Sequence, residues 1–145
     1  MSVGNQNSRK IDIMGTEAKF WAVVPVLATT DVIKTAEYYR DVLGFAVDDT
    51  FSSPEWTMLW ADQCQLFLSL NPTAARTAAG QQVLICVPGV DEMYEKHKAN
   101  GANIISDLED QSWGLREYTV EDPNGYHLTF EAHIETQYLP WKAKQ

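Results

Sequence analysis

The stretch DPNGYHLTFE, residues 122–131, shows how this chain is organised. Its first four residues, Asp122–Gly125, are rich in turn formers. The residues after them alternate between apolar and polar side chains, which is typical of a turn followed by a β-strand. The apolar side chains would face one side of a sheet, and His127, Thr129 and Glu131 would face the other. This polar side is either a metal site built on His and Glu or the polar wall of a cleft.

The same arrangement occurs earlier in the chain, which indicates an internal repeat. WADQCQLFLSL (60–70) aligns with VEDPNGYHLTF (120–130), and each segment has an aspartate in a tight turn. Seven positions after that aspartate a polar residue stands between apolar neighbours, Ser69 after Asp62 and Thr129 after Asp122. Shared turn spacing over matched elements predicts a duplicated unit.

The elements around these segments have the same order in both halves. In the first half we expect a strand at 20–28, a helix that starts at Asp31 and ends at Gly44, and strands at 45–51, 55–61 and 65–70. A linker rich in small residues, 71–80, follows. In the second half we expect a strand at 82–87, a helix in VDEMYEKHKANG that ends at Gly101, and strands at 103–108, 115–120 and 126–130.

This order predicts an α+β fold of two βαβββ modules, at about 20–71 and 81–133, within a single domain of residues 20–133. The polar N-terminal segment, 1–19, is expected to be a tail outside the fold. A C-terminal tail, 134–145, contains Tyr138, Leu139 and Trp141, and we expect it to pack on a sheet or on a partner chain because these side chains are apolar.

Composition and charge exclude several classes of function. The net charge is −9 and no Lys/Arg cluster is present, which argues against nucleic acid binding. No apolar run is long enough for a membrane span, and the N-terminus lacks the apolar core of a secretory signal, so we expect no membrane contact and a cytoplasmic location.

Cys64 and Cys86 are expected to be buried, reduced thiols. His97 is expected at a surface or half-buried helix position.

Two segments resemble a known superfamily. VPVLATTDVIKTAEYYRDVLGF (24–45) is similar to the opening of vicinal-oxygen-chelate proteins, the glyoxalase/bleomycin-resistance/dioxygenase superfamily, and WGLREYTVEDPNGYHLTFE (113–131) is similar to their closing segment. The resemblance covers roughly residues 22–132. It implies two βαβββ modules whose curled mixed sheets form a shared cleft, usually in a homodimer.

The resemblance also implies four positions for metal ligands, two in each module. In this chain they correspond to Val24, to Ser69 (or Phe67 in another alignment of the turn), to Gln82 and to Thr129. A catalytic divalent ion needs about three ligands drawn from His, carboxylate or thiolate. We therefore expect no metal and no other cofactor. An atypical site built on Glu131, Gln82 and a histidine, His127 or His133, is the alternative.

Among the branches of this superfamily, the chain most resembles the bleomycin-resistance proteins. Trp113–Tyr118 matches their WGREF-like segment with Leu115 inserted, Leu66–Ser69 matches their LFIS segment, and Trp56 matches an aromatic of the third-strand region. The resemblance implies a metal-free groove at a dimer interface that binds a large, planar, cationic drug. Indole rings stack on planar heterocycles and attract cations, and acidic groups add long-range attraction.

Three functions follow as hypotheses. The first is a non-catalytic protein that sequesters a planar aromatic or cationic small molecule, such as an antibiotic, as a homodimer. The second is a metal-dependent lyase, isomerase or dioxygenase with an atypical site, and the third is a structural or regulatory dimer with a vestigial cleft. For the first hypothesis no residue is catalytic, and the predicted ligand-binding residues are Trp56, Trp60, Phe67, Ser69, Gln82, Trp113, Glu117, His127, Thr129 and Glu131.

Overall fold

A computed structural model describes residues 20–134 of the chain and shows two modules of the same order. The first module contains β1 (Val26–Thr29), α1 (Val32–Asp41), β2 (Ala46–Ser52), β3 (Trp56–Ala61) and β4 (Cys64–Leu70). The connection contains α2 (Pro72–Ala75). The second module contains β5 (Gln82–Cys86), α3 (Val90–Ala99), β6 (Ile104–Asp110), β7 (Leu115–Glu121) and β8 (His127–His133).

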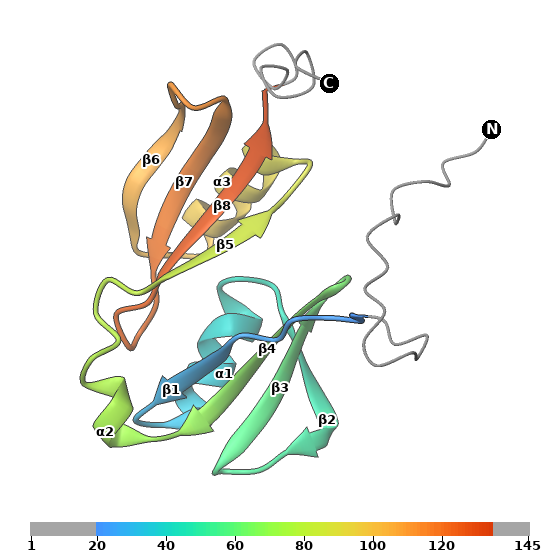
Figure 1. Cartoon of the computed structure of the whole chain (residues 1–145), viewed down its shortest axis with the longest axis vertical. Helices are drawn as coiled ribbons and strands as arrows, with labels where there is room; N and C mark the ends of the chain where they lie inside the picture. Colours follow the sequence, from blue (N-terminus) through green and yellow to red (C-terminus); the bar gives the residue numbers. More distant parts are fainter. Residues whose placement is uncertain (1–19, 135–145) are drawn as a thin grey trace, which may run out of the picture.

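Each module forms one four-stranded mixed sheet (Figure 1). The strand orders are β1-β4-β3-β2 and β5-β8-β7-β6, so the strand after the predicted turn lies inside its sheet in both modules. β1 is parallel to β4 and β5 is parallel to β8, whereas the other pairs are antiparallel. The predicted α+β fold of two βαβββ modules is confirmed, and neither sheet closes into a barrel.

The two long helices begin and end as their sequences predict. Asp31 caps α1 by accepting a hydrogen bond from the backbone N–H of Lys34, at 3.0 Å, which satisfies one of the free donors of the first turn. After each helix a glycine, Gly44 or Gly101, has a φ above +80°. This backbone conformation is unfavourable for residues that have a Cβ atom, which is why glycine ends both helices.

One face of each sheet packs on its helix. In the first module Leu27, Leu59 and Leu68 are buried on the α1 side together with Val32 and Tyr39 of the helix. In the second module the equivalent core contains Tyr94 and His97 of α3 and, from the sheet, Tyr118, Val120, Leu128 and Phe130. The alternation predicted for residues 126–130 is therefore present, with the apolar side chains toward the helix.

The turn at 122–125 joins the two modules. The Tyr39 hydroxyl of α1 donates to the buried Asp122 carboxylate at 2.7 Å, and the same carboxylate accepts from the backbone N–H groups of Asn124 and Tyr126. The Tyr126 hydroxyl in turn accepts from the backbone N–H of Ala28, at 2.8 Å. Burial raises the pKa of Asp122, although these donors partly offset the effect. The stretch that predicts the repeat therefore also fixes one module against the other.

Two predicted segments differ from the structure. The first strand covers only Val26–Thr29, because no described strand pairs with residues 20–24 and Pro25 has no N–H for a ladder. The linker at 71–80 contains the short helix α2, which Asn71 caps by accepting from the N–H of Ala74.

The burial of three residues was also predicted wrongly. Cys64 and Cys86 are exposed, because Cys64 directly follows the turn between β3 and β4 and Cys86 ends the edge strand β5. His97 is buried, at 1% exposure, because its side of α3 packs on the sheet. Each of its ring nitrogens has a partner, with Nε2 3.0 Å from the Leu43 carbonyl and Nδ1 2.8 Å from the Tyr118 hydroxyl.

The predicted tails, 1–19 and 134–145, lie outside the described residues except for Ile134. Within residues 20–134, none of the helices has the length and the apolar character that crossing a bilayer requires.

Candidate functional site

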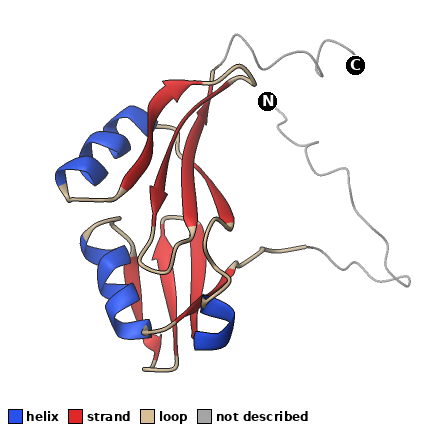
Figure 2. Cartoon of the chain, turned by 90° about the vertical axis from the view of Figure 1, so that its left-hand side faces the viewer, coloured by secondary structure: helices blue, strands red, loops and turns tan. Residues whose placement is uncertain are grey.

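The candidate residues other than Trp113 lie on the sheet faces that point away from the long helices. Figure 2 shows α1 and α3 on the same side of the strands, so the opposite faces of the two sheets point the same way. We call these the open face of sheet 1 (the sheet of β1–β4) and the open face of sheet 2 (the sheet of β5–β8). The two open faces therefore do not face each other within one chain.

The open face of sheet 1 is aromatic. Trp56 and Phe67 stack, with ring centroids 5.9 Å apart and planes inclined by 11°. Ser69 is the register partner of Trp56, and Trp60 is further along the same side of β3. The Trp60 indole N–H donates to the Asp48 carboxylate at 3.1 Å, and this hydrogen bond orients the Trp60 ring. Aromatic rings therefore line this face of β3. The four predicted residues of the first module are thus brought together.

The open face of sheet 2 is polar and acidic, and strand register explains which side chains meet. Glu117 is opposite Glu131, which is opposite Cys86. The next row, on the same face two residues along β8, contains Thr119, Thr129 and Leu84, and the row after that contains Glu121, His127 and Gln82. The five predicted residues of the second module's strands are therefore brought together on this face.

Electrostatics in the first row are set by the close carboxylates. Glu131 is only 7% exposed, and this burial together with the charge of Glu117 raises the pKa of its carboxyl. The Cys86 thiol donates to Glu131 Oε1 at 3.8 Å. Burial and the charge of Glu131 raise the pKa of that thiol, so Cys86 is protonated at neutral pH and is a poor nucleophile.

The donor set does not fit a catalytic metal. At the four implied positions the side chains are Val24, Ser69, Gln82 and Thr129, and Thr129 is engaged with the Thr119 hydroxyl at 2.9 Å. The atypical site is not assembled either, because Gln82 is opposite His127, four residues along β8 from Glu131. Among residues 20–134, no three His, Cys, Asp or Glu side chains are close enough to hold one ion.

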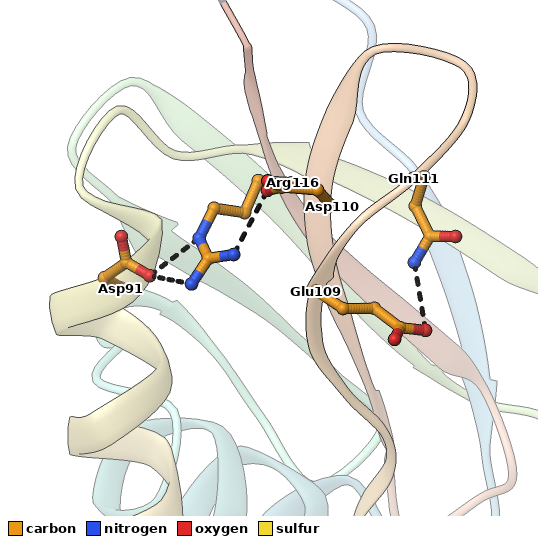
Figure 3. Close-up of polar contacts among 5 residues, drawn as sticks. All are labelled: Asp91, Glu109, Asp110, Gln111 and Arg116. Atoms are coloured by element: carbon orange, nitrogen blue, oxygen red, sulfur yellow. Dashed lines mark hydrogen bonds and ion pairs between the residues drawn. The ribbon is translucent and has the colours of Figure 1, made fainter.

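Trp113 is in the turn between β6 and β7 and is 61% exposed. An ion-pair network next to this turn fixes the hairpin to the start of α3 (Figure 3). The Arg116 guanidinium contacts Asp91 of α3 at 2.8 Å and Asp110 of β6 at 3.1 Å. Exposed ion pairs contribute little to stability, but a guanidinium held by two carboxylates from different elements restricts the hairpin's position. Trp113 is thereby presented at one end of sheet 2.

Leu84 and Cys86 are among the residues of the open face of sheet 2 that were not predicted as site residues. Leu84 is 61% exposed although it is large and apolar. The alternation in QVLIC (82–86) was the available signal, because it places both residues on the same side as Gln82.

A cavity of about 250 Å³ lies on the other side of sheet 1, between α1 and the edge strand β2. Its lining includes Val32, Ala36, Val47 and Pro54 with the hydroxyls of Ser52 and Thr57, and none of the predicted site residues. It is separate from both open faces, because Val32 and Ala36 belong to the helix-covered side of the sheet.

Known proteins resemble the chain over most of its length. The sequence model of the Glyoxalase/Bleomycin resistance protein/Dioxygenase superfamily matches residues 21–130. Among solved structures, TioX from Micromonospora sp. ML1 has a TM-score of 0.65 and 28% identity, over 79% of this chain and 99% of that one. The bleomycin-binding protein from bleomycin-producing Streptomyces verticillus, complexed with copper(II)-bleomycin, has a TM-score of 0.68 and 25% identity, over 79% of this chain and 98% of that one.

A third structure shares the fold. A glyoxalase-related enzyme from Clostridium phytofermentans has a TM-score of 0.66 and 22% identity, over 81% of this chain and 98% of that one. None of the curated proteins compared with the chain matches it.

Proposed function

Because the chain belongs to the Glyoxalase/Bleomycin resistance protein/Dioxygenase superfamily, we propose that it sequesters a planar aromatic or cationic small molecule, such as an antibiotic, without catalysing a reaction on it. The observation that carries the proposal is that one chain has two complementary surfaces, the stacked Trp56 and Phe67 of sheet 1 and the acidic row of Glu117 and Glu131 on sheet 2. The similarity to a bleomycin-binding protein supports the same class of ligand.

A second copy of the chain brings the two surfaces into one groove. The open faces point the same way within one chain, so they cannot face each other there. In a dimer, the open face of sheet 1 of one protomer can face the open face of sheet 2 of its partner. Exposed apolar side chains support such an interface, since Phe20, Trp21 and Val23 before β1 are each more than 80% exposed. We therefore propose a homodimer with two grooves, each built from both protomers. A cytoplasmic location is part of the same proposal.

Each groove would recognise its ligand by stacking and charge. A planar ring inserts beside Trp56 or under Trp113, and each contact of a cation with an indole contributes roughly 0.5–2 kcal/mol. A cationic group of the ligand is placed toward Glu117 and Glu131, where it relieves the repulsion between the two carboxylates. Neither contact requires a metal.

A thermal-shift screen of planar cationic antibiotics and aromatic metabolites, with bleomycin included, tests the proposal, because a ligand that binds only the folded state raises the melting temperature. For each hit, quenching of tryptophan emission then gives the affinity and the number of sites per dimer. Trp113→Ala should remove most of the affinity, since an aromatic anchor carries roughly 2 kcal/mol or more. Glu131→Gln should cost less and reduce the salt dependence, and Thr129→Ala is the control that changes little.

EDTA separates this proposal from an enzyme of the same superfamily. Binding of the hits should be the same with and without the chelator. Loss of binding in EDTA, or turnover of a hit that EDTA abolishes, would contradict sequestration and favour a metal-dependent lyase, isomerase or dioxygenase. A screen without any hit would favour a structural dimer.

A further inference from the structure

The cavity between α1 and β2 lies where the edge of sheet 1 is irregular. Val47 is opposite Leu59 and Ser52 is opposite Thr57, so five positions along β2 correspond to only two along β3. Such a bulge bends the edge strand out of regular pairing, and bulges often lie next to functional sites. The cavity at this point, of about 250 Å³, has α1 on one side and β2 with the turn that follows it on the other.

The turn at 52–56 gives the cavity a fixed wall. The Ser53 N–H donates to the Trp56 carbonyl at 2.7 Å, and the Ser53 hydroxyl accepts from the N–H groups of Glu55 and Trp56, each at 3.2 Å. Pro54 also lines the cavity, and its ring fixes φ. The wall is therefore formed before any ligand binds, as is usual for small-molecule sites.

The interior of the cavity combines apolar walls with a pair of hydroxyls. Val32 and Ala36 of α1 are buried, and with Val47 of β2 they form the apolar walls. The hydroxyls of Ser52 and Thr57 are hydrogen-bonded to each other, and Thr57 is only 2% exposed. A hydroxyl oxygen has two lone pairs, so the pair offers acceptors for an N–H group of a ligand.

The rim of the cavity is acidic. Arg40 lies on it, but its guanidinium donates to both carboxylate oxygens of Asp41, at 2.7 and 2.9 Å, so its charge is already compensated. Glu37, about one turn earlier on α1, is exposed and forms no ion pair with any residue of 20–134. An ammonium group placed here gains a partner, whereas a carboxylate group is repelled.

The volume limits the ligand to one or two rings. An apolar cavity of about 150 Å³ accommodates benzene, and drug-sized ligands occupy pockets of about 300–1,000 Å³. At about 250 Å³ this cavity lies between the two, which fits a single or fused ring with a short side chain.

We propose that this cavity is a second binding site, for an aromatic amine of one or two rings. The ring lies between α1 and β2, a ring N–H donates to the hydroxyl pair, and the ammonium group lies toward Glu37. The site goes beyond the proposed function, because it is on the helix side of sheet 1 and is complete within one chain. It can therefore fail while the proposed groove holds, and the reverse.

Tryptamine is the probe, because it joins an indole N–H to an ammonium group. Titration of the ¹⁵N-labelled full-length protein should give saturable shifts of the amide signals of residues 32–40 and 52–57 in two-dimensional NMR spectra. Indole-3-acetate has the same ring with a carboxylate and should bind about tenfold more weakly. The ratio combines a gain of about threefold from the contact with Glu37 and a similar loss from repulsion.

Substitutions on α1, each with a matched control on α3, test the two parts of the site. Ala36→Leu fills the cavity and should weaken tryptamine binding by about tenfold or more, whereas Ala99→Leu, at an exposed position, should leave it unchanged. Glu37→Gln should weaken tryptamine by about threefold and remove most of its preference over indole-3-acetate, whereas Glu95→Gln should not. Circular dichroism confirms the fold of each variant, and the exposed Glu37→Gln decides the test if Ala36→Leu does not fold.

Two results overturn the proposal. The first is the absence of saturable shifts at residues 32–40 up to about 10 mM tryptamine, or an affinity that neither Ala36→Leu nor Glu37→Gln changes. The second is a set of shifts confined to Trp113 and the strands of sheet 2, with an affinity that Trp113→Ala removes, because tryptamine then binds in the groove. Support requires the opposite pattern, in which Trp113→Ala leaves tryptamine binding unchanged and weakens only the hits of the thermal-shift screen.

Discussion

Replacing His97 with leucine should destabilise the protein and change how its stability depends on pH. The buried imidazole accepts at Nδ1 from the Tyr118 hydroxyl and donates from Nε2 to the Leu43 carbonyl, so it links α3 to the first module. Leucine fills a similar volume but leaves both partners buried without a hydrogen bond. Each such group costs about 1–3 kcal/mol, so His97→Leu should lower the free energy of unfolding by roughly 2–6 kcal/mol.

The pH dependence follows from the same contacts. Burial lowers the pKa of His97, although the Leu43 carbonyl partly opposes this. The unfolded state therefore binds a proton near pH 6.5 that the folded state does not, and stability falls as the pH decreases below that value. From pH 7.5 to 5.5 the parent should lose up to about 1.4 kcal/mol through this group, and the leucine variant should lose none of it.

Urea unfolding at pH 7.5 and pH 5.5, on the parent and on His97→Leu, measures both effects. Burial raises the pKa of Asp122 and Glu131, so these carboxyls act with the opposite sign, and because both proteins contain them they cancel in the comparison. Tyr118→Phe added to His97→Leu should recover about 1 kcal/mol, since it removes the unsatisfied hydroxyl. An identical pH dependence in the two proteins would refute a buried, neutral His97.

Other substitutions test the fold and the assembly. Gly44→Ala should lower the free energy of unfolding by about 1 kcal/mol in urea, because Gly44 has a φ of +83°. The added Cβ meets no atom within 4 Å, so the cost is that of the backbone conformation alone. Gly44→Asn should cost less, because asparagine tolerates this conformation better than alanine. Asp122→Ala should cost roughly 2–4 kcal/mol in the same assay, since it leaves a buried tyrosine hydroxyl and two backbone N–H groups without their acceptor, and Asp122→Asn should cost about half as much. Trp21→Asp and Val23→Asp should weaken self-association by about tenfold or more in sedimentation equilibrium, whereas Ile33→Asp on α1 is the control; unchanged association would refute the interface.

Local chemistry explains why most of the fold can be predicted from the sequence. The caps of α1, the glycines that follow both long helices and the alternation after the turn at 122–125 depend on neighbours within a few residues. The positions that could not be predicted depend on tertiary contacts. His97 looks polar in its helix, yet it is buried because two partners from distant segments satisfy its ring. Cys86 looks apolar, yet it is exposed because β5 is an edge strand.

The contrast between local chemistry and tertiary contacts also applies to the candidate site. Period-two alternation places Trp56 with Trp60, and His127 with Thr129 and Glu131, on one side of their strands. It contains no information on how one sheet is oriented relative to the other, and the open faces point the same way instead of enclosing a cleft within one chain. For that reason the residues could be predicted as two groups, whereas the groove that we propose between them requires a second copy of the chain.

A complementation experiment tests the central claim most directly. Trp56→Ala removes an aromatic anchor from sheet 1, and Trp113→Ala removes one from sheet 2. When the two variants are unfolded together and refolded in equal amounts, about half of the dimers are mixed, and each mixed dimer has one groove with both tryptophans intact. Titration with the tightest ligand of the thermal-shift screen should then show about a quarter of the parental number of sites at parental affinity, although neither variant binds alone. A mixture that binds no better than the separate variants would contradict a groove shared between two chains.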